Sequence, residues 1–213
     1  MVSPTAVALI LGSYLLGSVS FAAIVASKAR GIDLRSVGSG NLGATNVGRT
    51  LGKSWGLLVY VLDLLKGLLP VLLAEAFFET EWAFGTIPVP VLCAAAALLG
   101  HCFPIFYGFR GGKGVATASG IILAHSAFTL LAVLASFVVG LLASRMVSVG
   151  SMLGAVVLPV AYLAIERRHA LEMPNLAWLT LYLLMGILVI VLHRSNIQRI
   201  VEGTEHRIGG KKP

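Results

Sequence analysis

The sequence predicts an all-α, polytopic integral membrane protein. Of its 213 residues, 57% are hydrophobic and only 12% are charged, and the mean hydropathy is +0.92. Long uncharged runs recur along the whole chain, as expected of helices that cross the hydrocarbon core of a bilayer. Ordinary soluble domains have a different composition. We therefore expect a single transmembrane domain over residues 1–213.

Five apolar runs are simple candidates for spanning helices: residues 4–26, 54–78, 87–103, 147–165 and 175–192. No Lys or Arg precedes the first run, so it lacks the basic segment of a secretory signal peptide, and we expect a permanent helix. The run 115–144 is also uncharged, but one helix there measures roughly 45 Å, against about 30 Å for the hydrocarbon core. We therefore expect two short helices, 115–124 and 127–144, with a break near His125 and Ser126.

The distribution of Lys and Arg selects the topology. With seven crossings and the N-terminus outside, 13 basic residues face the cytoplasm and two, Arg167 and Arg168, face the outside. With six crossings the split is nine to six, and the basic tail lies outside. Because cytoplasmic loops are enriched in Lys and Arg, we predict seven transmembrane helices, two of them short, and a cytoplasmic C-terminus. Four polar segments then share the cytoplasmic side: 27–53, 104–114, 145–148 and 193–213.

The first polar loop is rich in glycine. Between Arg35 and Arg49 it contains four glycines, two serines, two asparagines and a threonine. Glycine lets backbone amides approach an anion, so this composition favours an anion site, although a plain turn between helices also explains it. The segment Gly38–Gly43 formally matches GxGxxG. It follows a transmembrane helix, however, and lacks the βαβ unit of a dinucleotide site.

The second polar loop, Gly108–Thr117, leads directly into a short apolar helix. Its amides and Lys113 then lie at a helix N-terminus, where anions bind. The loop is not a Walker A sequence, because three residues separate Gly108 from Gly112 and Gly114 replaces the Ser or Thr that binds magnesium. Topology alone accounts for the basic residues but does not require three glycines around a lysine. We therefore expect a phosphate cradle.

The C-terminal tail carries polar residues that a membrane anchor does not need. His193 and Asn196 have helical spacing as the last span ends, and the helix is expected to break at Gly203. An interfacial amphipathic helix accounts for the isoleucines and basic residues of the tail. It leaves His193, Asn196 and Glu205 unexplained.

Two charged residues lie inside the second span. Asp63 and Lys66 are three residues apart and share a helix face, where they form a structural ion pair or line a polar pocket. His101, near the inner end of its span, has the same two interpretations. Cys93 and Cys102 lack metal-site spacing, and no catalytic triad or metal-ligand cluster can be placed from the sequence.

Three segments together, Ser39–Asn46, Gly111–Thr117 and His193–Glu205, resemble the motifs of the PlsY family of bacterial acyl-phosphate-dependent glycerol-3-phosphate acyltransferases. The signatures Asp63–Gly67 and Gly100–Pro104 match as well, so the resemblance covers nearly the whole chain. It implies a seven-helix enzyme of the bacterial cytoplasmic membrane, with its active site facing the cytoplasm. The enzyme would transfer a fatty acyl group from acyl phosphate to the 1-hydroxyl of glycerol 3-phosphate. Lysophosphatidic acid and inorganic phosphate would result, in the first acylation step of phospholipid synthesis.

The resemblance also implies roles for residues at matched positions. The set expected to bind acyl phosphate is Ser39, Gly40, Asn41, Gly43, Gly112, Lys113, Gly114 and Thr117. The set expected to bind glycerol 3-phosphate is Asn46, Arg49, Lys113, Ser148, His193 and Asn196. The expected catalytic residues are Ser39, Lys113, His193, Asn196 and Glu205, and the expected supporting polar residues are Asp63, Lys66 and His101. Backbone amides and Lys113 would stabilise developing negative charge.

Two mechanistic questions stay open at this point. Glu205 acts either as a base or as an organiser of basic neighbours. The acyl group is transferred either by direct attack of the glycerol hydroxyl or through a transient acyl-Ser39, and the resemblance favours direct transfer. We expect no cofactor and no metal, because displacement of phosphate from a mixed anhydride needs neither.

The expected partners are acyl phosphate, glycerol 3-phosphate and membrane lipid. The net charge of +7 is explained mostly by topology, so we expect no nucleic acid. The chain lacks the His-x4-Asp pattern of CoA-dependent acyltransferases. The alternative function is a transporter of a phosphorylated small solute, which would also need a basic, glycine-rich site. The absence of an internal repeat disfavours it.

Overall fold

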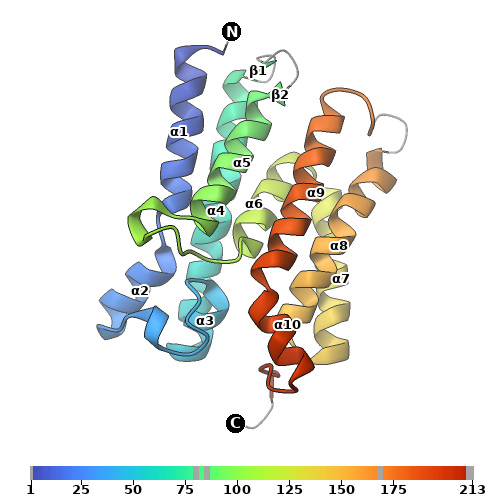
Figure 1. Cartoon of the computed structure of the whole chain (residues 1–213). Coiled ribbons are helices and arrows are strands. Elements are labelled where there is room, and N and C mark those ends of the chain that lie inside the picture. The colour runs from blue at the N-terminus through green and yellow to red at the C-terminus, as the bar shows by residue number, and fades with distance from the viewer. Residues whose placement is uncertain (1, 79–81, 84–86, 167–169, 210–213) are drawn as a thin grey trace. The chain divides into compact units, whose positions relative to one another are not determined.

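The computed structural model in Figure 1 describes residues 2–78, 82–83, 87–166 and 170–209. Within these ranges the chain is helical, apart from a two-residue antiparallel pairing of β1 (Trp82–Ala83) with β2 (Ile87–Pro88). The predicted helical class is therefore confirmed. Some basic residues used to predict the topology lie outside the described residues: Arg167, Arg168, Lys211 and Lys212.

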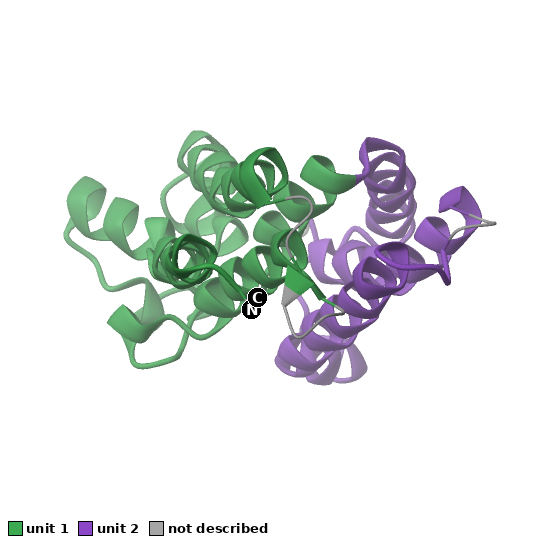
Figure 2. Cartoon of the chain, turned by 90° about the horizontal axis from the view of Figure 1, so that it is seen from above, with its two compact units in different colours: residues 1–125 green, residues 126–213 purple. Residues whose placement is uncertain are grey.

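The chain divides into two compact units, residues 1–125 and residues 126–213, which Figure 2 shows in different colours. The single domain predicted over residues 1–213 stays a prediction. The helices of the first unit are α1 (Pro4–Ser18), α2 (Phe21–Arg30), α3 (Ala44–Thr50), α4 (Lys53–Phe78), α5 (Val89–Cys102) and α6 (Val115–His125). Short 3-10 turns occur at Leu34–Ser36 and Ile105–Tyr107. Helix α4 is central to this unit, because it contacts α1, α3, α5 and α6.

The first span is broken, which corrects the prediction of one continuous helix over residues 4–26. Helix α1 ends at Ser18, and Ser20 caps α2 by accepting a hydrogen bond from the Ala23 amide at 3.3 Å. The break leaves the Val19 carbonyl outside any helix ladder, and Lys66 of α4 donates to it at 2.9 Å. Irregular backbone at membrane depth is tolerated where protein groups satisfy it. This buried lysine therefore makes the break possible.

The predicted break near His125 and Ser126 is confirmed. Helix α6 ends at His125, and Ser126 is the N-cap of α7 (Ala127–Ser144). Helix α6 is short, yet it is fixed firmly to α4 by close backbone contact. A Cβ on Gly67 of α4 would overlap the Thr117 carbonyl, and one on Gly120 of α6 would overlap the Leu64 carbonyl. Small residues allow this approach between membrane helices.

The second unit contains α7, α8 (Val147–Glu166), α9 (Asn175–Leu192) and α10 (Arg194–Val201). Helix α8 packs against both α7 and α9. Aromatic side chains fill the contact between α8 and α9: the rings of Tyr162 and Tyr182 meet edge to face with centroids 5.0 Å apart. Helix α10 continues from α9 after His193 and leads into the tail.

Six segments of the described chain are long and apolar enough to cross a membrane. They are Pro4–Arg30, Lys53–Phe78, Val89–Tyr107, Ala127–Ser144, Val147–Glu166 and Asn175–Leu192. Helix Val115–His125 is apolar but shorter. These segments indicate a multi-pass membrane protein. The seven crossings and the sidedness of the termini stay predictions.

Candidate active site

Asn46 holds the first glycine-rich loop together. Its Oδ1 accepts a hydrogen bond from the Ser39 amide at 2.9 Å. Its Nδ2 lies within hydrogen-bond distance of three loop carbonyls, those of Leu34 at 3.3 Å, Val37 at 3.1 Å and Asn41 at 3.1 Å. The side chain is 1% exposed. The polar atoms of Asn46 thus shape the loop, and its expected contact with glycerol 3-phosphate stays a prediction.

Two glycines give this loop its turn. Gly38 and Gly40 have φ angles of +61° and +68°, in the left-handed region that side chains rarely adopt. The amides of Gly40 and Gly43 donate to carbonyls within the loop at 3.1 and 3.0 Å, and the Ser39 amide donates to Asn46. These three amides are thus not available to an anion, contrary to the expectation from composition. The glycines shape the turn. The exposed Ser39 side chain is the group of this turn that can contact a substrate.

The second loop folds back onto the end of α5. The amides of Gly111 and Gly112 donate to the carbonyls of Cys102 and His101, both at 3.1 Å. A Cβ on Gly112 would overlap the His101 ring, and a Cβ on Gly111 would overlap the His101 carbonyl. Both positions therefore require glycine. The Gly112 amide, too, is used internally and does not face a ligand.

Helix α6 (Val115–His125) begins directly after this loop. The backbone amides of its first turn can bind an anion, unlike the loop amides described above. Gly114 has a φ of +82°, and its carbonyl accepts the Ala118 amide at 2.7 Å, so the preceding first-turn amides lack partners within the helix. Thr117 lies in this turn, and its fully buried hydroxyl has no hydrogen-bond partner among the described residues. The half-buried Lys113 lies just before the helix. Amides, hydroxyl and ammonium together suit an anion.

Asp63, Lys66 and His101 meet in the interior of the first unit. Lys66 Nζ lies 2.9 Å from Asp63 Oδ1, and His101 Nδ1 lies 3.7 Å from the same oxygen. All three side chains are 5% exposed or less. An isolated charge at this depth is costly, so the pair depends on mutual contact and on the Val19 carbonyl. Because the His101 ring lies against Gly112, the cluster also supports the second loop.

Glu205 is the centre of a polar cluster in the second unit, and its side chain is 1% exposed. Its Oε1 accepts hydrogen bonds from the Ser148 hydroxyl at 2.8 Å and from Asn196 Nδ2 at 2.7 Å. Its Oε2 accepts a hydrogen bond from Arg199 Nε at 2.8 Å. Ser148 lies in the first turn of α8, whereas Asn196 and Arg199 lie on α10. One carboxylate therefore joins two helices and the tail.

This environment defines the charge state of Glu205. Burial by itself raises the pKa of the carboxyl, but hydrogen bonds from Asn196, Ser148 and Arg199, with the charge of Arg199, hold the pKa below its ordinary value. The group is thus ionised at neutral pH, and both oxygens are occupied. A buried carboxylate with a lowered pKa is a weak base. The geometry favours the organising role of Glu205 over the catalytic-base role.

The neighbours of Glu205 differ in what they can offer a substrate. Ser148 donates its hydroxyl hydrogen to Glu205, and its expected contact with glycerol 3-phosphate stays a prediction. Asn196 donates an amide hydrogen to Glu205, which fixes the orientation of its side chain. His193 Nδ1 lies 2.7 Å from the Val189 carbonyl. A carbonyl only accepts, so this contact assigns the proton to Nδ1 and leaves Nε2 as the acceptor of the neutral ring.

Arg199 is a site residue that sequence reasoning missed. It belongs to a basic tail, and topology alone seemed to explain it. Its position three residues after Asn196 places both on one helix face, which is the signal that could have identified it. In the part of the chain that the structure describes, no three His, Cys, Asp or Glu side chains gather in a way that could hold a metal ion.

These features define a class: a multi-pass membrane protein that carries a helix N-terminus suited to an anion in one unit and a carboxylate-organised polar cluster in the other. The family model described as glycerol-3-phosphate acyltransferase matches residues 7–203. The chain belongs to the glycerol-3-phosphate acyltransferase family.

Similar proteins of known name agree with this assignment. The glycerol-3-phosphate acyltransferase of Desulforamulus reducens is 42% identical over 218 residues, and the match covers 100% of both chains. A crystal structure of PlsY (YgiH), an integral membrane glycerol 3-phosphate acyltransferase, in its glycerol 3-phosphate form has a TM-score of 0.83 and 40% identity. The lysophosphatidic acid form of PlsY has a TM-score of 0.80 and 39% identity. Each covers 96% of both chains.

Proposed function

We propose that this chain transfers a fatty acyl group from acyl phosphate to the 1-hydroxyl of glycerol 3-phosphate. The products are 1-acyl-glycerol 3-phosphate and inorganic phosphate. The observation that carries the proposal is the family match over residues 7–203. It is supported by PlsY structures in a glycerol 3-phosphate form and a lysophosphatidic acid form, which hold an acceptor and a product of this reaction.

The chemistry needs one bond made and one broken. The 1-hydroxyl oxygen attacks the carbonyl carbon of acyl phosphate, negative charge develops on the carbonyl oxygen, and the carbon–oxygen bond to phosphate breaks. The hydroxyl proton leaves with the phosphate, so all atoms balance without a cofactor. Lys113, the first-turn amides of α6 and the Thr117 hydroxyl are the groups of the first unit suited to the developing charge.

Three side chains are assigned to the acceptor, as the family resemblance implies. Arg49 lies in the last turn of α3 and can bind a phosphate in a fork. His193 and Asn196 supply the polar groups of the second unit, oriented by the Val189 carbonyl and by Glu205. Ser148 and Glu205 are positioning residues in this assignment.

Direct transfer is the proposed route. The Ser39 hydroxyl has no hydrogen-bond partner among the described residues of its own unit, so no base there activates it as a nucleophile. We assign it to donation toward the acyl phosphate. Intact-mass measurement after mixing with palmitoyl phosphate alone tests this: no palmitoyl adduct is expected, and an adduct lost in Ser39→Ala would establish the acyl-enzyme.

The site is further proposed to face the cytoplasm in a seven-crossing arrangement of the bacterial inner membrane. Support comes from the basic loops and from the confirmed break between α6 and α7. In a background with Cys93→Ala and Cys102→Ala, an impermeant maleimide added to whole cells should label Leu171→Cys and not Lys53→Cys. The reverse labelling, or labelling of both, would overturn the topology.

Phosphate release by the purified chain tests the function. Palmitoyl phosphate should yield phosphate and lysophosphatidate only when glycerol 3-phosphate is present, and palmitoyl-CoA should not replace it. Lys113→Ala should abolish turnover. Saturable binding of glycerol 3-phosphate without turnover would instead support the transporter alternative.

A further inference from the structure

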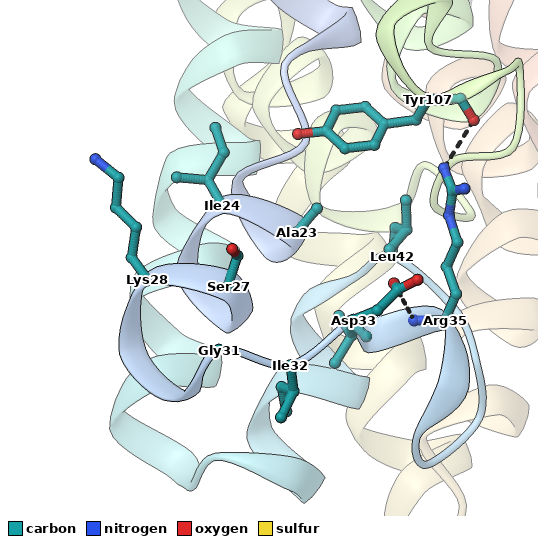
Figure 3. A pocket seen from close by; sticks show the side chains of 11 residues that line it. Ala23, Ile24, Ser27, Lys28, Gly31, Ile32, Asp33, Arg35, Leu42 and Tyr107 are labelled. Carbon is teal, nitrogen blue, oxygen red and sulfur yellow. Dashed lines mark hydrogen bonds between the residues drawn. The ribbon is translucent and has the colours of Figure 1, made fainter.

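A pocket of about 510 Å³ lies in the first unit, and its lining includes none of the residues assigned above to the two substrates. Figure 3 shows Ala23 and Ser27 of α2 on one side of it and Tyr107 and Arg35 on the other. Lys28 lies at its outer rim. A volume of this size is typical of a small-molecule site.

Arg35 is a fixed cation on the pocket wall. Its Nη2 donates to the Tyr107 carbonyl at 2.8 Å, and its guanidinium carbon lies 5.7 Å from the centre of the Tyr107 ring. A guanidinium has five N–H donors in a planar fork, so most of them remain available to a phosphate. Asp33 is next to it and accepts the Arg35 amide at 3.0 Å. The pocket thus presents a cation and a carboxylate side by side.

The position of the pocket along the chain is that of a membrane interface. It follows the first apolar span, where α2 ends with Lys28 and Arg30 in its last turn. The turn that carries Tyr107 also exposes Phe106 and Phe109, which are 61% and 58% exposed. Aromatic and basic residues of this kind mark the headgroup level of a bilayer. Molecules that reach the pocket from this level are amphiphiles.

The walls of the pocket match the two ends of such a molecule. Ala23, Ile24 and Ile32 form an apolar side next to the end of the span. The opposite side holds Arg35 and Asp33. The carboxylate repels a bare phosphate, and it favours a headgroup that carries a hydroxyl donor beside its phosphate.

We propose that this pocket binds the headgroup of an anionic membrane phospholipid, separately from the catalytic site. The phosphate lies on Arg35, and a headgroup hydroxyl donates to Asp33. Lys28, whose ammonium points away from Arg35 in Figure 3, adds only a longer-range attraction. The acyl chains leave along the apolar side into the bilayer. The site therefore links the enzyme to the composition of the membrane it supplies.

Native mass spectrometry of the full chain in detergent tests the proposal, with dioctanoyl phosphatidylglycerol as the probe and the zwitterionic dioctanoyl phosphatidylcholine as its counterpart of zero net charge. We expect one phosphatidylglycerol to bind in preference to phosphatidylcholine. Arg35→Gln should weaken binding about tenfold, as expected for the loss of one charged hydrogen-bonded contact, and Lys28→Gln should weaken it less. Arg30→Gln, a basic residue of the same helix turn that does not line the pocket, should leave binding unchanged.

Two further variants make the test decisive. Ala23→Leu narrows the pocket without altering charge and should also weaken the binding of phosphatidylglycerol, even if Arg35→Gln folds poorly. Lys113→Ala should retain lipid binding, whereas loss of binding would place the lipid at the catalytic site. Equal binding of both lipids, complete competition by inorganic phosphate, equal effects of Arg35→Gln and Arg30→Gln, or no effect of Ala23→Leu would each overturn the proposal.

Discussion

The two units build their polar sites in different ways. In the first unit the site depends on backbone: glycines that accept no Cβ, a helix N-terminus, and Asn46, whose side chain serves main-chain groups. In the second unit it depends on side chains, which gather around the carboxylate of Glu205. The first design is intolerant of added volume, and the second is intolerant of lost charge. Substitutions can therefore separate them.

Removal of Lys113 is expected to have the largest effect. Lys113→Ala takes away the ammonium beside the N-terminus of α6, and loss of one such group at a developing anion lowers kcat by about 100- to 1000-fold. Phosphate release from palmitoyl phosphate in the presence of glycerol 3-phosphate measures it. A variant with at least a third of wild-type turnover would remove Lys113 from the catalytic set.

A single methyl group in the second loop should be nearly as harmful. Gly112→Ala would place a Cβ against the His101 ring and 2.9 Å from the Leu42 carbonyl, so the loop must shift. Displacement of a catalytic group by about 1 Å costs on the order of 100-fold in rate. The matched control is Gly12→Ala, where a Cβ meets nothing within 4 Å and activity should be unchanged. Equal activity of both variants would show that the loop is not tightly held.

Loss of charge in the second unit should produce a smaller and more selective effect. Glu205→Gln retains the size of the side chain but removes the negative charge that pairs with Arg199, so Asn196 loses its charged acceptor. We expect kcat/KM for glycerol 3-phosphate to fall at least about tenfold, because three donors share the lost charge. Steady-state kinetics with glycerol 3-phosphate as the varied substrate measures it. A full loss of activity for Glu205→Gln would instead indicate direct chemistry by Glu205.

The pH dependence of stability tests whether the ionised Glu205 carboxylate stabilises the second unit. The pKa of Glu205 is lowered in the folded protein, so its stabilising contribution is present above the ordinary glutamate pKa of about 4.3 and is lost as the pH falls through the lowered value. Thermal unfolding of the wild type should therefore show a decline on acidification below about pH 4.3. Glu205→Gln should lack this part of the decline. An identical acid profile for both proteins would contradict the assignment.

The smallest expected effect is that of Ser148→Ala. It removes one of the donors to Glu205 and leaves Asn196 and Arg199 in place. One neutral donor to a carboxylate contributes about 1.5 kcal/mol or less after exchange with water, so the loss of kcat/KM for glycerol 3-phosphate should remain under about tenfold. The same kinetic assay measures it. An effect larger than that of Glu205→Gln would restore Ser148 as a direct ligand.

The sequence predicted most of the helices and the polar side chains of the candidate site. It did not predict features that depend on contacts between residues distant in sequence. The break at Ser126 was predictable because helix length and membrane thickness are local quantities. The break after Ser18 was not, because it depends on a donation from Lys66, which is distant in sequence. Composition likewise predicted amides that face an anion, whereas Asn46 and the loop carbonyls use several of them.

The site of the second unit shows the same limit. Glu205 was singled out from the tail, but its partner Ser148 is 57 residues away and its role could not be assigned. Arg199 was hidden among basic residues that topology explains. Hydrogen-bond partners set the function of a buried carboxylate, and they become visible only in three dimensions.

The most direct test of the division between the units is a pair of Michaelis constants measured in two variants. Gly112→Ala should lower kcat/KM for palmitoyl phosphate and leave the KM for glycerol 3-phosphate within about twofold, since binding lost at one substrate alters that substrate's KM. Asn196→Ala should lower kcat/KM for glycerol 3-phosphate and leave the KM for palmitoyl phosphate within about twofold. If both variants changed the same constant by the same factor, the assignment of Gly112 and its loop to the donor and of Asn196 to the acceptor would be wrong.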